Sequence, residues 1–507
     1  MFKKLLSLML TAATIMAFTT GCQNDASDVD ETEGNTDVVE TEQSEAKTPK
    51  YVFMFIGDGM SPVQINAAQV YKGNNTYGEI ELGKLNFTQF PVAGMVTTQD
   101  STSFAPDSAS TATSLSSGYK THSGVIGLEA DKETSSSNIA ELLKEQGMKI
   151  GIVSSVTINH ATPAAYYAHV ASRNDYYEIA LQMAASDFDY FAGGAISQAT
   201  GKEQDQKDAY EILGENGYTY VNTKEDILAL NSTSGKVYAE APNTIGGAMQ
   251  YEIDAEEGDV TLATLVEKGI DVLDNEDGFF MMVEGGKIDW TCHANDAMTS
   301  IMDTIALDNA VKVAMDFAAK YPEETLILVT GDHETGGMTI GYATTGYDTA
   351  FDILSKQTMS YEMFDILLDE MKEANPSLTF EDMLPVVKEN FGLLVSTDSD
   401  AEKEENANLV LTDYEYKKLV AGFNEWMTPD EDEANSQELS LLYGGYNAFS
   451  VSLTHILNNK AGIGWTSYSH TGTPVAMHAM GASAEEFGGY YDNTEVFHKL
   501  VEVLGLK

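Results

Sequence analysis

Short apolar runs alternate with longer stretches of helical pattern along most of the chain. Four runs are continuous enough to predict buried strands, at residues 51–56, 150–156, 279–283 and 326–330. Stretches such as 139–146 and 297–319 predict helices between them. Alternating strands and helices are typical of a parallel sheet that is covered on both faces. The pattern therefore predicts an α/β fold, a three-layer αβα sandwich with a mostly parallel central sheet.

The pattern changes between about residues 345 and 464. Acidic sequence without clear strands replaces the alternation, and stretches 359–373 and 414–426 predict helices. We interpret this segment as a helix-rich insertion or cap. It contains no twelve-residue loop of the EF-hand kind, so a solvated acidic face is a simpler interpretation than a calcium site.

The N-terminus has the features of an export signal. Two lysines precede an apolar run at 5–18 that is too short to span a membrane, and Cys22 follows it. This predicts a lipoprotein-type signal over 1–21, with Cys22 as the lipidated new N-terminus; an ordinary secretory signal cut nearby is the alternative. Residues 22–49 are acidic and predict a disordered tether. We expect an exported protein at the cell surface or in the periplasm.

Composition excludes some partners and points to one residue. The formal net charge is −51, and nucleic acid is excluded as a partner because phosphate backbones need a basic surface. With 43% hydrophobic residues, the chain can form a large core. Cys22 and Cys292 are its two cysteines, which are too few for a disulfide framework. Arg173 is the single arginine among the 28 lysine and arginine residues of the chain.

Acidic residues follow three of the predicted strands. Asp58, Glu284 and Asp332 each stand beside a glycine at a strand end. The carboxyl ends of parallel strands face one crevice, so we expect these carboxylates to converge. A single acid of this kind would be an ordinary solvated loop residue, whereas three predict a site.

Further residues have the spacing of metal ligands. Asp289 and His293 are four residues apart, so one helical turn would place both on one face, although a helix-surface pair is the alternative. Asp332 and His333 are adjacent and could reach one ion at a turn, and His470 is a further candidate. Imidazole together with carboxylate suits zinc, and oxygen ligands alone suit magnesium.

Ser108 is the candidate nucleophile. Asp107 can cap a helix that begins at Ser108, which would bring the positive end of the helix dipole to that serine. A plain N-cap before a Ser/Thr-rich turn is the alternative. The Gly-x-Ser-x-Gly elbow of acyl-transfer enzymes is absent, so activation by metal is the alternative chemistry.

Several segments around these candidate residues resemble the sequences of bacterial alkaline phosphatases. The resemblance rests on residues 55–60, 107–109 with 118–121, 159–163 through Arg173, 283–289 with His293, 330–333 and 470–472. They occur in the family's order over 51–345 and again from about 464 to 507. The resemblance implies an alkaline phosphatase domain over 50–507 that hydrolyses small phosphate monoesters. Relatives are often homodimers, although the 345–464 insertion could cover that interface.

The resemblance also implies a role for each candidate residue. Ser108 would become a phosphoserine intermediate, and Arg173 would clamp the phosphoryl oxygens with a planar fork that lysine cannot reproduce. The first zinc would be held by Asp289, His293 and His470. The second zinc would be held by Asp58, Asp332 and His333. A third ion, usually magnesium, would be held by Asp58, Thr162 and Glu284.

Some positions depart from the family pattern. His160 and Trp290 stand where the best-studied bacterial type has an acid and a lysine, which leaves the third metal and the outer phosphate contacts open. His470 lies unusually far along the chain from His333, so its assignment rests on its local motif. We interpret Cys292 as a buried neutral thiol, because the adjacent zinc site is already complete; an extra soft metal ligand is the alternative.

Two other functions remain as alternatives. One is a phosphodiesterase or phosphonate hydrolase of the same superfamily, which Arg173 and the third-metal residues argue against. The other is a surface lipoprotein that binds phosphate or metal without turnover. Ser108 argues against it, because binding alone needs no nucleophile.

Overall fold

The computed structural model describes residues 48–76, 78–429 and 436–506. The predicted signal, Cys22 and most of the predicted tether lie outside these ranges. Within them, no helix combines the length and the apolar content needed to cross a membrane.

The central feature is a ten-stranded sheet with the order β16-β2-β15-β10-β1-β9-β3-β4-β6-β5. Its strands are β1 (Tyr51–Gly57), β2 (Val92–Thr97), β3 (Lys149–Thr157), β4 (Tyr190–Gly194), β5 (Thr219–Val221), β6 (Val237–Glu240), β9 (Phe279–Gly285), β10 (Thr325–Gly331), β15 (Val475–Gly481) and β16 (Gly489–Asp492). Only β15 runs antiparallel to its two neighbours in this sheet. The prediction of a mostly parallel sheet is therefore confirmed.

The four strands predicted from apolar runs lie side by side at the centre of the sheet, as β10, β1, β9 and β3. Every residue of β1 is buried. Tyr51, Phe53 and Phe55 pack into the core on one face, whereas Val52 and Met54 pack into the core on the other. An unbroken apolar run is the expected sequence of a strand that is covered on both faces.

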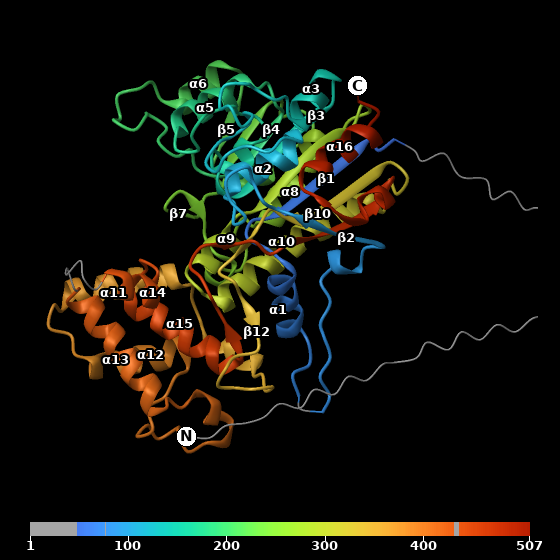
Figure 1. The fold of residues 1–507 in the computed structure, drawn as a ribbon. Helices are drawn as coiled ribbons and strands as arrows, with labels where there is room; N and C mark the ends of the chain where they lie inside the picture. Colours follow the sequence, from blue (N-terminus) through green and yellow to red (C-terminus); the bar gives the residue numbers. More distant parts are fainter. Residues whose placement is uncertain (1–47, 77, 430–435, 507) are drawn as a thin grey trace, which may run out of the picture. The chain divides into compact units, whose positions relative to one another are not determined.

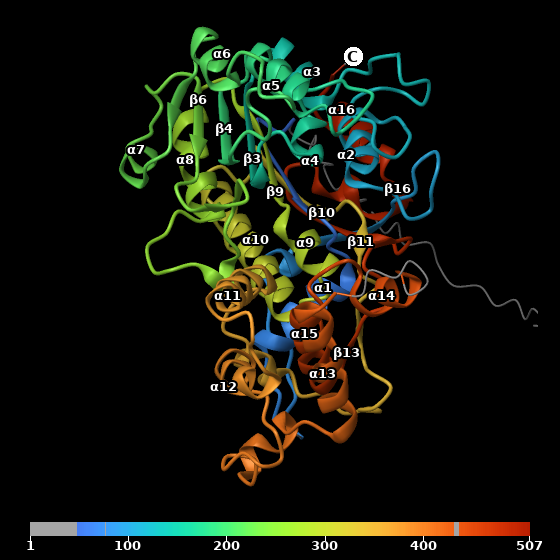
Figure 2. The same ribbon diagram turned by 90° about the vertical axis from the view of Figure 1, so that its left-hand side faces the viewer.

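Helices cover both faces of the sheet, as Figures 1 and 2 show. One face packs against α1 (Pro62–Lys72), α8 (Leu262–Leu273) and α10 (Ala297–Ala318). The other packs against α2 (Ser108–Ser117), α3 (Ile139–Glu145), α5 (Tyr176–Ala185), α6 (Ala209–Glu215) and α16 (Thr494–Val503). These layers confirm the predicted αβα sandwich.

Shorter elements connect the layers. The helices among them are α4 (Ala161–Ala164), α7 (Lys224–Leu228), α9 (Lys287–His293), η1 (Phe87–Gln89), η2 (Glu252–Asp254) and η6 (Ala484–Phe487). The short strands are β7 (Thr244–Ile245), β8 (Ala248–Met249), β11 (Glu334–Thr335), β12 (Thr339–Ile340), β13 (Ile463–Gly464) and β14 (His470–Thr471).

The segment that was interpreted as an insertion is helical where the structure describes it. Its elements are η3 (Phe351–Lys356), α11 (Tyr361–Ala374), α12 (Phe380–Phe391), η4 (Glu404–Leu409), α13 (Asp413–Met427), α14 (Ser436–Tyr443) and α15 (Ala448–Ala461). Aromatic rings fill its interior, for example Phe364 against Phe391 at 5.0 Å between centroids. The chain leaves after β12 and returns through β13, which pairs antiparallel with β12.

Candidate active site

Three neighbouring strands bring the predicted carboxylates together. Asp58 follows β1 directly, Asp332 follows β10, and Glu284 is the last residue but one of β9. Since β1 lies between β10 and β9 in register, these three side chains meet at one edge of the sheet. All three are buried. The expected convergence at the carboxyl ends of the strands is therefore confirmed.

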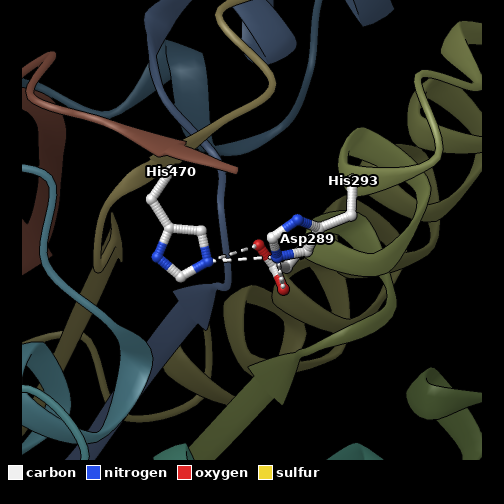
Figure 3. A group of neighbouring side chains, drawn as sticks. All are labelled: Asp289, His293 and His470. Carbon is white, nitrogen blue, oxygen red and sulfur yellow. Dashed lines mark hydrogen bonds and ion pairs between the residues drawn. The ribbon is translucent and has the colours of Figure 1, made fainter. Parts of the chain in front are cut away.

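The first group of candidate metal ligands consists of Asp289, His293 and His470 (Figure 3). One ligand atom from each lies within 4.8 Å of the others. The Nε2 atoms of the two histidines are 3.1 Å apart, and His293 Nε2 lies 3.3 Å from Asp289 Oδ2. Each Nδ1 instead contacts a backbone carbonyl, that of Tyr468 at 2.6 Å and that of Pro106 at 2.5 Å. These contacts orient both Nε2 atoms toward the group.

The second group consists of Asp58, Asp332 and His333. His333 Nε2 lies 3.3 Å from Asp58 Oδ1 and 3.4 Å from Asp332 Oδ2. Asp332 Oδ1 accepts hydrogen bonds from the backbone N–H groups of Gly59 at 3.1 Å and of His333 at 2.8 Å. The turn after β10 thus lets two adjacent side chains face one point, as the sequence predicted.

The third group consists of Asp58, Glu284 and His160. The Thr162 hydroxyl donates to Asp58 Oδ2 at 3.4 Å, so Thr162 borders this group. Glu284 Oε1 and His160 Nδ1 are both buried and have no hydrogen-bond partner among the described residues. Ser154 donates a very short hydrogen bond to the other oxygen of Glu284. His160 is a residue that the sequence analysis named only as a departure from the family pattern.

The electrostatics of the three groups fit divalent cations. Burial and the nearby carboxylates raise the pKa of Asp58 well above its ordinary value, and burial raises the pKa values of Glu284 and Asp332 to about 7. Burial opposes ionisation of Asp289, but nearby imidazoles, His293 foremost, outweigh it and hold its pKa well below the usual range. Clustered buried carboxylates with imidazoles are a donor set that a divalent cation neutralises.

Ser108 faces the second group. It is the first residue of α2, and the Asp107 side chain caps that helix by accepting from the Ser110 N–H at 3.1 Å. Ser108 Oγ lies 3.2 Å from His333 Nε2 and 3.5 Å from Asp58 Oδ1. The predicted cap is confirmed, and it places a buried hydroxyl at the positive end of a helix.

Arg173 approaches the serine through Asp107. Its Nη1 donates to Asp107 Oδ2 at 2.9 Å, and its Nη2 lies 3.3 Å from His160 Nε2. Asp107 Oδ1 also accepts from the backbone N–H of Gly124 at 2.9 Å. Burial and the nearby guanidinium lower the pKa of His160 to about 3, so its imidazole is neutral. The single arginine is thus held by Asp107, the residue before Ser108, and lies beside His160 of the third group.

Cys292 and Thr335 both border the site, but the sequence analysis named only Cys292. Cys292 is buried, as predicted, and burial raises the pKa of its thiol. The sequence analysis missed Thr335, whose hydroxyl donates to Asp289 Oδ1 at 2.5 Å. Its position two residues after His333, on the short strand β11, was the one available signal.

Comparisons with known proteins identify the family. The model of the family described as "Alkaline phosphatase" matches residues 49–506. Alkaline phosphatases 3 and 4 of Bacillus subtilis (strain 168) are 27% and 28% identical to this chain, over 99% of its length and 97% and 98% of theirs.

Solved structures agree with this. The cold-active alkaline phosphatase of a psychrophilic Shewanella species is 26% identical, with a TM-score of 0.71 over 90% of this chain and 99% of that one. The Thermus thermophilus alkaline phosphatase, 24% identical, shares the fold with a TM-score of 0.72 over 94% of this chain and 96% of that one. The chain belongs to the alkaline phosphatase family and is a phosphomonoesterase.

Proposed function

We propose that the protein hydrolyses phosphate monoesters through a phosphoserine intermediate at Ser108, with two zinc ions and one magnesium ion. The observation that supports this most is the position of Ser108 Oγ, 3.2 Å from His333 and 3.5 Å from Asp58. The Ser108 hydroxyl is buried among side chains of metal-ligand types. Its position suits a nucleophile.

The donor sets support the choice of metals. The first group offers two imidazoles and a carboxylate, and the second offers two carboxylates and an imidazole, which are zinc-type sets. The third group offers carboxylate and hydroxyl oxygens, which suit magnesium, but it also includes the neutral imidazole of His160. The structure of an alkaline phosphatase from the Antarctic bacterium TAB5, in a variant with aspartate in place of a histidine, has Mg bound in its M3 site.

Different residues of this chain have different roles in the proposed phosphoryl transfer. Divalent ions in such a site lower the pKa of a hydroxyl and offset charge on the entering and leaving oxygens. Ser108 Oγ attacks phosphorus, forming a new P–O bond while the bond to the leaving oxygen breaks. The serine proton passes to solvent, and the leaving oxygen takes up a proton from solvent to give the alcohol. Arg173 holds two non-bridging oxygens, in the orientation that Asp107 imposes on its guanidinium.

The second half of the reaction regenerates the serine. A water molecule attacks phosphorus from the side opposite Ser108, and the P–O bond to the serine breaks. Ser108 takes up a proton, and inorganic phosphate leaves. Arg173 and the N-terminal end of α2 remain in place throughout, so both halves use one preorganised site.

We also propose that the enzyme is exported and held at the membrane by a lipid on Cys22, and that it forms a homodimer. The apolar run before Cys22 and the acidic tether support export and anchoring. Labelling of wild type and Cys22→Ser with a radioactive fatty acid tests the anchor. Sedimentation of the purified enzyme tests the dimer.

Metal analysis combined with assays of wild type and Ser108→Ala tests the proposed reaction. We expect both proteins to bind the full set of metals, wild type to hydrolyse a monoester far faster than a diester, and the variant to lose turnover. The exposed Ser355→Ala, on η3 and outside the site, is the matched control and should remain fully active. Unchanged turnover in Ser108→Ala would refute the phosphoserine intermediate. Faster hydrolysis of a diester than of a monoester would favour a phosphodiesterase. Metal binding without turnover in wild type would indicate a binding protein.

A further inference from the structure

Glu334 is a buried carboxylate that none of the three ligand groups includes. It is 1% exposed, and both of its oxygens accept two hydrogen bonds. Oε1 accepts from Gln64 Nε2 at 2.9 Å and from the Met338 N–H at 3.2 Å. Oε2 accepts from the Gly337 N–H at 3.1 Å and, over a very short distance, from the Thr471 hydroxyl. All four donors are neutral, so this carboxylate is held by hydrogen bonds rather than by an ion pair.

The hydrogen bond to Thr471 joins two distant parts of the chain. Glu334 and Thr471 are 137 residues apart and face each other across the antiparallel pair β11–β14. The next pair in this register is Thr335 with His470. The side-chain bond therefore lies one residue from a candidate ligand of the first metal group.

The neighbours of Glu334 on its own strand and on the partner strand lead to ligands of the first group. On its own strand, the neighbouring Thr335 donates to Asp289 at 2.5 Å. On the partner strand, Thr471 follows His470 directly. A shift of Glu334 would thus disturb two of the three ligands. In the second group, His333 directly precedes Glu334, but Asp332 is held separately by the backbone N–H groups of Gly59 and His333.

Gln64 connects this cluster to the helix that follows the Asp58 loop. Its Oε1 accepts from the Ser61 N–H at 3.0 Å and from the Ser61 hydroxyl at 2.8 Å, which fixes the orientation of the amide. Its Nε2 is then directed at Glu334 and at the Thr335 carbonyl, 3.2 Å away. Glu334 is thereby anchored to a rigid capped helix on one side and to the His470 strand on the other.

We propose that Glu334 is a positioning residue that holds the His470 strand against the His333 turn and so sets the zinc affinity of the first group. This inference rests on the proposed metal chemistry. Partners that orient metal ligands without touching the metal affect metal affinity by about 10- to 100-fold when they are removed. Because the bond to Thr471 is the side-chain contact between the two strands at this point, its loss should affect the first group more than the second.

Two substitutions test the role of Glu334. Glu334→Gln keeps the shape but turns an amide NH₂ toward two donors, so at least one pair of hydrogen bonds is lost. Thr471→Val keeps the shape of threonine and removes the hydrogen bond between the strands, together with an exposed contact to the Thr473 hydroxyl at 3.2 Å. The control is Asp308→Asn on α10, a buried carboxylate that accepts from Asn86 at 2.8 Å and does not touch the site.

The experiment measures zinc binding to the metal-free full chain against a competing chelator, with His470→Ala as the reference for loss of the first group. We expect Glu334→Gln to weaken the first-group zinc by about 10- to 100-fold and to affect the other zinc less, and Thr471→Val to weaken the same first-group zinc by a smaller factor. Excess zinc should restore kcat in both variants. Asp308→Asn should bind zinc as wild type does.

Wild-type affinity in both Glu334→Gln and Thr471→Val would overturn the proposal, as would equal weakening of both zinc ions. If Glu334→Gln does not fold, Thr471→Val decides alone. Wild-type protein that binds no zinc would refute the proposed function together with this inference. Intact wild-type zinc binding with unaffected variants would refute this inference only.

Discussion

Asp107 links Ser108, the proposed nucleophile, to the guanidinium of Arg173. One of its oxygens accepts from Arg173 at 2.9 Å, and the other caps the helix that begins with Ser108 by accepting from the Ser110 N–H at 3.1 Å. A single carboxylate therefore contacts both the start of the Ser108 helix and the guanidinium that would hold the phosphoryl oxygens.

Arg173→Lys tests whether the planar shape of the guanidinium matters in addition to its positive charge. Lysine keeps the positive charge but cannot donate two parallel hydrogen bonds. We expect kcat/KM for a monoester to fall by about 10- to 100-fold, which corresponds to about 1.4–2.8 kcal/mol of lost transition-state stabilisation. Steady-state kinetics measure the effect, with the surface variant Lys236→Arg as the control. Equal activity of Arg173→Lys and wild type would contradict the assigned role.

Removal of metal should destabilise the fold. Asp58, Glu284 and Asp332 are buried close together, and a bound cation offsets their mutual repulsion. At free metal of about 1,000 times Kd, binding stabilises the folded state by about 4 kcal/mol per site. A chelator should therefore lower Tm markedly, and re-addition of zinc should restore it. A Tm that does not respond to chelation would show that these groups hold no metal.

The acidic composition predicts a salt effect on substrate capture. A chain with a formal charge of −51 repels a phosphomonoester dianion at long range, and salt screens this repulsion. We expect kcat/KM to rise as ionic strength increases from a low value, with little change in kcat. Initial rates at subsaturating substrate across a salt series measure it. A flat or falling profile would count against the prediction.

Asp365 on α11 should make the stability of the helical segment depend on pH. Burial raises its pKa to about 7, and one of its oxygens has no hydrogen-bond partner among the described residues. Because the folded state then binds the proton more tightly than the unfolded chain, the stabilisation is fully present below about pH 4 and is lost as the pH rises through 7.

Asp365→Asn should remove this dependence. The decline in unfolding free energy from pH 4 to pH 7 should be smaller in the variant than in wild type, by on the order of 2 kcal/mol. Urea denaturation at several pH values measures the difference, with the exposed Asp316→Asn as the control. Parallel pH profiles of wild type and Asp365→Asn would exclude the effect.

The parts of the site that were predictable from sequence depend on local pattern. Asp58 and Asp332 follow apolar strands directly, and Asp289 and His293 have the spacing of one helical turn. Because these patterns involve only neighbouring residues, they can be recognised in the sequence without a structure.

The parts that were not predictable depend on contacts between distant segments. No local pattern shows that β15 inserts antiparallel between β2 and β10, or that Glu334 accepts from Thr471. His470 had only its short motif, and its place in the first group follows from the pairing of β14 with β11. Pairing partners far apart in the chain are chosen by the packing of the whole fold.

The central claim is that the phosphoryl group passes through Ser108. The most direct test is mass spectrometry of wild-type enzyme quenched with acid during turnover of a phosphate monoester. We predict one added phosphoryl group on the peptide that contains Ser108, and none on that peptide from Ser108→Ala. Rapid turnover of the monoester with no phosphoryl group on Ser108 at any quench time would contradict the account.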